Sequence, residues 1–426
     1  MSNPATTSTN PRREIAKVSI LGTTQLHLRN PMVIAFWSIM FPGLGQMLLS
    51  KYISGFILFI WELFVNRMAQ INLGIYYTVL GQFEMAKAVV DIRWAVLYIP
   101  TYAFAIWNAY RTTVDVNKNY ILASREDAQI KPFVMSIAGI NYLDKSSPWT
   151  ATLWSMLMPG LGQLMIHRIV VAFFLLTAWI SLIYLSKFLP ALHYTLLGRF
   201  NAAALVVEWQ WLLSLPSIYF FSLYDAYVNT VESNKLFKWE QAKFLKRDYQ
   251  YKLFSMPFKK EQKKGDKMYI ASTFEHSINL ELAITAIQMK GIAKEDILAI
   301  PLDKREEEKR LFDTIHSSDD LSLLNFPVIL GALLSVLGLI YGFILNWGPI
   351  AWALIGMCIG FGVGLLIKLY TTKEYSKRKT SKNASEVILI IACKENQKDM
   401  VKDLLWTNSA MGVSQLSLDD DHDPVN

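Results

Sequence analysis

The sequence Pro-Gly-Leu-Gly-Gln occurs twice in this chain, at residues 42–46 and again at residues 159–163. Identities at the same offset of 117 residues continue across residues 31–118, for example between Trp37 and Trp154. Self-similarity over so long a stretch is the signature of a duplicated structural unit. The sequence therefore predicts two copies of one apolar fold in tandem.

Each motif interrupts an apolar segment. Proline lacks the N–H that a helix interior uses, and glycine lacks a side chain, so we expect the helix to bend or to allow close contact there. A packing kink is the first interpretation; the alternative is a broken helix that lines a substrate or ion site, as in transporters. The basic residue five positions after the glutamine is expected at the membrane interface. The residues concerned are Pro42, Gly43, Gly45, Gln46 and Lys51 in the first copy, and Pro159, Gly160, Gly162, Gln163 and Arg168 in the second.

The composition favours a membrane protein with substantial polar regions. Of the 426 residues, 53% are hydrophobic and 18% are charged, whereas soluble domains carry about 25% charged residues. Two cysteines exclude a disulfide scaffold. A spanning helix needs roughly 20 apolar residues, and we expect about eight apolar segments, at 32–49, 53–66, 94–110, 149–166, 169–186, 209–227, 323–345 and 349–370.

The last two segments predict a transmembrane hairpin with its turn at residues 346–349. Glycines recur at every fourth position in the second segment and would lie on one helix face, which lets helices approach closely in lipid. We expect packing within the hairpin, with an oligomer interface as the alternative. The glycines concerned are Gly331, Gly338, Gly342, Gly356, Gly360 and Gly364.

The number of crossings per repeat stays open. Three apolar segments in each repeat would place the two copies upside down relative to each other, as in many transporters. The region after each repeat is basic, however, and the positive-inside rule would place both regions in the cytoplasm. That outcome requires an even number of spans, and segment 32–49 is then a candidate for a re-entrant or interfacial element.

Basic clusters follow both membrane regions directly. Their position favours attraction to anionic lipid headgroups over nucleic-acid binding. They also place the soluble parts and the C-terminus in the cytoplasm of a multi-pass cell-membrane protein. The principal residues are Lys259, Lys260, Lys263, Lys264, Lys377, Arg378 and Lys379.

The remaining sequence predicts a small α+β domain. Residues 268–273 and 297–302 are expected as strands, with a helix between them whose apolar residues recur at i, i+3, i+4 and i+7 and which stops near Gly291. The same order recurs as strand 387–393, a helix around Val401, and strand 413–418. Two such halves can pair into one ferredoxin-like sheet that the transmembrane hairpin splits.

This order resembles bacterial small stress-protein domains of the general-stress, heat-induced type. The resemblance covers residues 268–418 and depends on Phe274, the helix before Gly291, and the hairpin glycines. The repeated motif and its flanking segments likewise resemble the bacterial two-transmembrane-helix domain family. Both resemblances imply small membrane modules, and neither implies an enzymatic activity.

Sequence motifs for catalysis, nucleotide binding or metal binding are absent, so we expect neither an enzyme nor a cofactor or metal site. Three polar residues inside or beside apolar segments are candidates for function: Glu62, Asn108 and Asp225. For Asp225, capping of a helix or pairing with a nearby arginine is the equal alternative. Asn108 and Asp225 are equivalent positions of the two repeats, while the equivalent of Glu62 is Trp179.

We therefore expect a non-catalytic membrane scaffold or regulatory subunit whose cytoplasmic domain engages a protein partner or a second copy. A transporter or channel component built from the broken helices is the alternative. The expected boundaries are 1–30 (polar tail), 31–130 (repeat 1), 131–147 (linker), 148–247 (repeat 2), 248–267 (basic linker), 268–302 (first half-domain), 303–320 (charged linker), 321–370 (hairpin), 371–385 (basic linker), 386–418 (second half-domain) and 419–426 (acidic tail).

Overall fold

The computed structural model describes residues 11–250, 254, 267–302, 325–376 and 386–416. These residues divide into two compact units. Unit 1 comprises residues 11–142, 146–232 and 325–376, and unit 2 comprises residues 143–145, 233–302 and 386–416, apart from the gaps given above. Helices make up most of the described chain, and the sheets are small.

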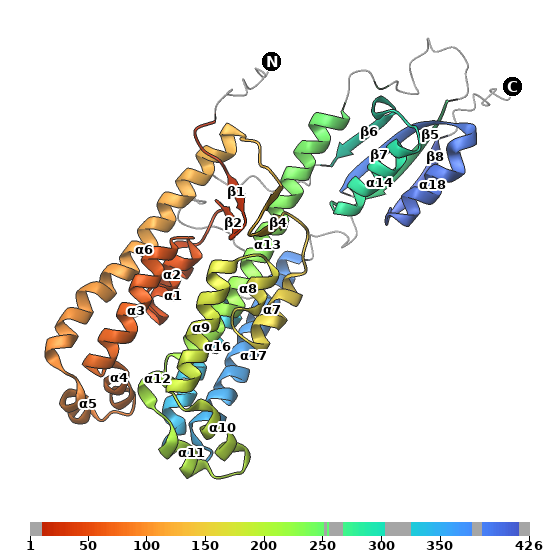
Figure 1. Cartoon of the computed structure of the whole chain (residues 1–426). Helices are drawn as coiled ribbons and strands as arrows, with labels where there is room; N and C mark the ends of the chain where they lie inside the picture. Colours follow the sequence, from red (N-terminus) through yellow and green to blue (C-terminus); the bar gives the residue numbers. More distant parts are fainter. Residues whose placement is uncertain (1–10, 251–253, 255–266, 303–324, 377–385, 417–426) are drawn as a thin grey trace. The chain divides into compact units, whose positions relative to one another are not determined.

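Unit 1 contains the tandem repeat, element by element (Figure 1). Every element from residue 16 to residue 92 begins 117 residues before its counterpart. The first copy is β1 (Ala16–Ser19), β2 (Gly22–Gln25), α1 (Pro31–Met40), α2 (Leu44–Leu48), α3 (Tyr52–Ala69), α4 (Ile71–Val79), α5 (Phe83–Val89) and α6 (Ile92–Glu126). The second copy is β3 (Phe133–Ser136), β4 (Gly139–Tyr142), α7 (Pro148–Leu157), α8 (Leu161–Met165), α9 (Ile169–Leu185), α10 (Phe188–Leu196), α11 (Phe200–Val206), α12 (Trp209–Leu212) and α13 (Leu215–Tyr249).

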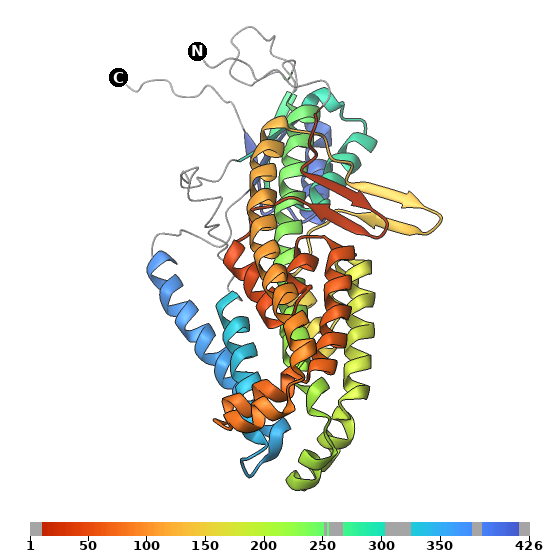
Figure 2. The same cartoon turned by 90° about the vertical axis from the view of Figure 1, so that its left-hand side faces the viewer.

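Each repeat begins with a β-hairpin that the sequence analysis did not anticipate. The first hairpin lies in the stretch expected to be a polar tail, and the second lies in the expected linker. The two hairpins lie side by side (Figure 2), and the side-chain amide of Asn141 donates to the Ser19 carbonyl at 2.6 Å. The repeating unit therefore extends about 15 residues further toward the N-terminus than the apolar pattern indicates, from Pro31 back to Ala16.

The path of α1 can be followed along the long helix α6, because residues before and within α1 form hydrogen bonds with successive positions of α6. Ahead of α1, the Arg29 amide donates to the Asn117 side chain at 2.9 Å. Near the end of α1, the Tyr102 hydroxyl donates to the Ile39 carbonyl at 2.6 Å. The chain thus advances along α6 from the height of residue 117 to that of residue 102.

After the motif, the chain turns back along the same helix. The Gln46 side chain of α2 donates to the Ala105 carbonyl at 2.9 Å. The Lys51 ammonium then lies 3.4 Å from the Thr112 hydroxyl. Because α1 and α2 enter and leave at one end of the α6 segment between Tyr102 and Asn117, segment 32–49 forms a hairpin of two short helices and not one continuous helix.

Helix α3 runs in the opposite direction along the part of α6 between Ile92 and Thr112. It starts after Lys51, beside Thr112, and at its far end the Ala69 carbonyl accepts a hydrogen bond from the Asp91 amide at 3.2 Å. From Ile92 to Thr112 a helix rises about 30 Å at about 1.5 Å per residue. This length equals the roughly 30 Å hydrocarbon thickness of a bilayer.

The second repeat follows the same path and runs parallel to the first. The Tyr219 hydroxyl donates to the Met156 carbonyl at 3.0 Å, which reproduces the Tyr102–Ile39 bond 117 residues later. Phe56 of α3 stacks on Phe174 of α9, with ring centroids 4.5 Å apart, at nearly equal heights of the two copies. The upside-down arrangement of repeats considered from the sequence is therefore wrong.

Two described helices are long and apolar enough to cross a membrane, namely Tyr52–Ala69 and the Gly348–Lys368 part of α17. The number rises to five if each bent helix pair counts as one span, and Pro31–Met40, Ile278–Met289 and Phe326–Gly342 are shorter apolar helices. Segment 94–110 lies in α6, and segment 209–227 lies in α12 and α13; each follows a sharp bend, after α5 in the first repeat and after α11 in the second.

Helices α16 (Asn325–Gly342) and α17 (Gly348–Ser376) form a close hairpin (Figures 1 and 2). A methyl group added to Gly360 would lie 2.8 Å from the Cα of Gly331, and one added to Gly364 would lie 2.6 Å from the Cα of Pro327. Gly338, Gly342 and Gly356 also face the opposite helix. Gly331 differs, because it also faces the ring of Phe220 in α13 at 2.8 Å.

Unit 2 is a four-stranded antiparallel sheet in the order β6-β7-β5-β8, with two helices on one face. The buried face of the sheet packs on apolar residues of α14 and α18, and Ile391 of the central strand pairs with both Ile270 and Ile297. The predicted strands and helices are confirmed. They are β5 (Lys267–Phe274), α14 (Ile278–Met289), β6 (Ile297–Pro301), β7 (Val387–Lys394), α18 (Lys398–Thr407) and β8 (Gly412–Leu416), with short 3-10 turns at Lys294–Asp296 and Glu395–Gln397.

Candidate functional site

The glycines of the motif make the turn between the two short helices of each helical hairpin. Gly43 and Gly160 have φ of 100° and 104°, in the left-handed region that favours glycine. A side chain at either position would also collide with the next helix. A Cβ on Gly43 would lie 2.9 Å from the Phe59 amide nitrogen, and one on Gly160 would lie 2.7 Å from the Ala172 carbonyl oxygen. The motif thus forms a tight turn that packs on the following helix.

The glutamine of the motif joins this turn to the long helix of its repeat. Gln163 is fully buried, and its side-chain nitrogen donates to the Ser222 carbonyl at 2.8 Å, as Gln46 does to Ala105 in the first repeat. Its oxygen accepts from the Ser155 hydroxyl at 3.2 Å. Because these buried polar groups are satisfied within the repeat, they stabilise the turn and leave no free donor for a ligand.

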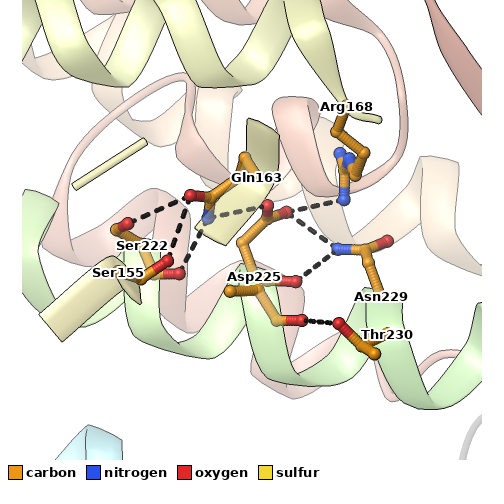
Figure 3. A network of polar contacts seen from close by, with 8 residues as sticks. Ser155, Gln163, Arg168, Ser222, Asp225, Asn229 and Thr230 are labelled. Carbon is orange, nitrogen blue, oxygen red and sulfur yellow. Dashed lines mark hydrogen bonds and ion pairs between the residues drawn. The ribbon is translucent and has the colours of Figure 1, made fainter. Parts of the chain in front are cut away.

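The second repeat adds a buried ion pair to this network (Figure 3). Arg168 donates to the Asp225 carboxylate at 2.8 Å, and the two side chains are 7% and 0% exposed. Gln163 and Asn229 also donate to Asp225, at 3.2 and 2.9 Å. Arg168, expected at the membrane interface, is instead buried against Asp225. The opposite charges of Arg168 and Asp225 compensate each other, so the pair has a structural role.

The first repeat has the same positions without the ion pair. Asn108 replaces Asp225, and Lys51 replaces Arg168. Lys51 is exposed and approaches the Thr112 hydroxyl at 3.4 Å. Lys51 is therefore exposed, whereas its counterpart Arg168 is buried.

Glu62 belongs to a second buried polar cluster, where the two repeats meet. Its Oε1 accepts from Asn66 at 2.8 Å and from the Tyr98 hydroxyl at 3.2 Å. Gln210 of the second repeat donates to the Asn66 carbonyl at 3.0 Å, and Asn72 donates to the Gln210 carbonyl at 2.8 Å. The cluster therefore links α3 and α4 of the first repeat to α12 of the second.

A cavity of about 10 Å³ lies within this cluster, about the size that one water-sized species needs. Two oxygens of residues on its wall, Glu62 Oε2 and Gln210 Oε1, are buried and have no protein donor in the described part of the chain. The full lining is Phe41, Glu62, Leu63, Asn66, Asn72, Gln210, Trp211 and Ser214.

In unit 2, the solvent face of α14 is unusually apolar. Leu282 is 53% exposed and Met289 is 83% exposed, and Ile278 lies one turn before Leu282 on the same face. Trp406 on the neighbouring helix α18 is 53% exposed as well. Exposed apolar residues that share one helix face mark interaction surfaces.

Several expected site residues lie outside the described residues. These are Lys259, Lys260, Lys263, Lys264, Lys377, Arg378 and Lys379. Among the residues that are described, no group of three His, Cys, Asp or Glu side chains is placed to hold a metal ion.

Comparison of the chain with protein-family models, with curated proteins and with solved structures gives no match.

Sequence reasoning found Glu62 but missed its partners. Asn66 lies one helical turn after Glu62, a spacing that places two polar side chains on one face of an apolar helix. Gln210 could not be found in this way, because it lies 148 residues from Glu62 and no pattern joins them.

Proposed function

We propose that this chain is a non-catalytic integral membrane protein that holds a ferredoxin-like α+β domain at the cytoplasmic face of the cell membrane, where the domain engages a protein partner. Unit 1 is the membrane anchor in this proposal. Unit 2 carries the interaction surface.

Two observations support the membrane assignment of unit 1. The α6 segment that α3 follows is about 30 Å long, which matches the hydrocarbon thickness. Helix α3 exposes Ile53, Ile57, Ile60 and Phe64 at helical spacing, each more than half exposed, which forms a stripe suited to lipid. In this proposal α3 and α6 cross the membrane in the first repeat, and α9 and α13 cross it in the second. Helices α16 and α17 add two crossings, and the short helix pairs α1–α2 and α7–α8 are re-entrant and do not cross.

The end of α6 supports the orientation. Arg111, Lys118 and Arg125 lie beyond the apolar part of that helix, and excess Lys and Arg favour the cytoplasmic side. Two crossings per repeat return the chain to this side each time. Unit 2 follows the same end of the second repeat in sequence.

The strand order of unit 2 supports the ferredoxin-like assignment in this proposal. In the order β6-β7-β5-β8, β7 lies between β5 and β6, and β5 lies between β7 and β8. Each strand–helix–strand half is therefore split by a strand of the other half, as in the ferredoxin-like fold.

The proposed partner binds the solvent-exposed apolar face of α14. Leu282 and Met289 are exposed on a helix whose opposite face already fills the core with Leu280, Ile284 and Ile287. Trp406 adds an exposed aromatic side chain of the kind that dominates interface energetics.

Purification of the full chain from its own membranes in mild detergent tests the proposal. We expect a stoichiometric protein partner that is lost in the double variant Leu282→Lys, Met289→Lys. The control is Glu295→Lys, which makes the same change of two charge units at an exposed position of unit 2. Equal retention of the partner by both variants would contradict this interface, and a second copy of the chain as sole partner would appear as a dimer by light scattering.

A transporter or channel component is the second candidate, because Glu62 is a carboxyl group buried between the two repeats. Ion or solute flux by the purified chain in liposomes, with no partner present, would favour this candidate over the scaffold.

A further inference from the structure

The chemistry of the small cavity between the repeats follows from the hydrogen bonds that the described residues make with Glu62. Oε1 of Glu62 accepts two hydrogen bonds, from Asn66 and from Tyr98. Oε2 has no protein donor, although Glu62 is only 4% exposed. One oxygen of this buried carboxylate therefore has no hydrogen-bond donor among the described residues.

The amide groups around the carboxylate have already used most of their donors. The Asn66 side-chain nitrogen donates to Glu62 and to Asn72, and the Gln210 nitrogen donates to both the carbonyl and the side-chain oxygen of Asn66. The Gln210 side-chain oxygen, 6% exposed as a residue, is left without a donor. Two unpartnered acceptors thus belong to residues that line one cavity.

No positive side chain compensates Glu62. The interactions of this carboxylate are hydrogen bonds from Asn66 and Tyr98, and no described Lys, Arg or His forms an ion pair with it. An isolated buried carboxylate is costly in a low dielectric. A positive charge inside the cavity would remove that cost.

We propose that the cavity lined by Glu62, Gln210 and Ser214 is a binding site for a small monovalent cation of the size of Na⁺. Carboxylate, amide and hydroxyl oxygens are the ligands that hard cations prefer. The cavity admits one species about as large as a water molecule, so K⁺, which is larger, should fit less well.

The site has a structural consequence, since its oxygens come from both repeats. Glu62 lies on α3 of the first repeat, and Gln210 and Ser214 lie on or beside α12 of the second. A bound cation would fasten the two copies together. The Arg168–Asp225 ion pair, by contrast, joins two side chains of the second repeat.

Equilibrium binding of radioactive ²²Na⁺ to the purified full chain in detergent is the first test. We expect one saturable ion per chain, displaced only weakly by K⁺. Glu62→Gln keeps the shape and removes the charge, so it should lower the Na⁺ affinity by at least about tenfold. Glu84→Gln, which neutralises an exposed carboxylate of the same repeat, is the control and should bind like the wild type.

Thermal unfolding at constant ionic strength, with choline replaced by Na⁺, gives the second readout. We expect a saturable rise in melting temperature for the wild type and for Glu84→Gln, and none for Glu62→Gln. If Glu62→Gln does not fold, the wild-type stoichiometry alone decides. No saturable ²²Na⁺, unchanged binding by Glu62→Gln, or a melting temperature that responds to pH and not to Na⁺ would each overturn the proposal.

Discussion

Neutralising Asp225 gives the strongest test of the network in Figure 3. The wild-type Arg168 side chain is 7% exposed, and its Nη1 lies 2.8 Å from Oδ1 of Asp225. The variant Asp225→Asn keeps the size of the side chain at position 225 but leaves this buried guanidinium without its anion. Breaking a buried ion pair on one side costs about 3–5 kcal/mol, because the remaining charge is buried without compensation. We expect Asp225→Asn to lower the free energy of unfolding by this amount.

The matched double variant separates the charge from the packing. Arg168→Met with Asp225→Asn removes both charges, and replacing a whole buried pair by apolar groups is often neutral. We expect the double variant to be at least about 2 kcal/mol more stable than Asp225→Asn alone, because the unpaired charge is gone. Lys51→Met and Asn108→Ala, at the equivalent positions of the first repeat, should cost less than about 1 kcal/mol because no ion pair exists there.

Denaturant titration of the purified chain, followed by tryptophan fluorescence, measures all of these free energies under one condition. A cost below about 1 kcal/mol for Asp225→Asn would refute the reasoning. Additive costs in the double variant would refute it too, since they would show that the two side chains do not act as a pair.

Three further predictions follow from glycine packing and from the charges of unit 2. Gly360→Leu should destabilise the chain by about 1–3 kcal/mol, because its Cβ would lie 2.8 Å from the Cα of Gly331. A Cβ at Gly362 would meet no atom within 4 Å, so Gly362→Leu should change stability by less than about 0.5 kcal/mol in the same titration. Gly43→Ala and Gly160→Ala should each cost about 2–4 kcal/mol, since the left-handed turn and the close contact both oppose a side chain; an unchanged unfolding midpoint would contradict this. Burial, with the Glu281 carboxylate nearby, raises the pKa of Glu240 in unit 2 from 4.5 to about 7. The folded state then holds this proton more tightly than the unfolded state, so the stability of unit 2 should fall as pH rises from about 4.5 through 7. Hydrogen exchange of the β5 amides in the full chain should show this trend, and Glu240→Gln should weaken it.

Much of the architecture could be predicted, because the duplication and the apolar periodicity are local signals. The offset of 117 residues fixed the repeats, and the continuous apolar run at residues 387–393 identified β7. The hairpins at the start of each repeat were missed because their strands are four residues long and only partly apolar. A signal was present, since Ser-Ile-x-Gly occurs at residues 19–22 and again at 136–139, in register with the repeat.

The partners of buried polar groups could be predicted only in part: an arginine partner was one interpretation for Asp225, but Arg168 was not identified as that partner. Arg168 was expected at an interface because a basic residue after an apolar segment commonly marks a membrane boundary. Its pairing with Asp225 depends on the turn at Gly160, which returns the chain toward α13. The number of crossings was undecided for the same reason, because hydropathy measures the length of an apolar segment and not whether it reverses direction.

The central claim is that both repeats run parallel, with a re-entrant pair followed by two crossings. Single cysteines introduced at Ser50 and Lys118, at one end of α6, and at Gly81 and Gly198, after α4 and α10, test it in sealed inverted vesicles with a membrane-impermeant thiol reagent. The background is a chain in which Cys358 and Cys393 are replaced by alanine. The account predicts labelling at positions 50 and 118 and protection at positions 81 and 198. Labelling of only one of positions 81 and 198, or protection at position 50, would contradict it.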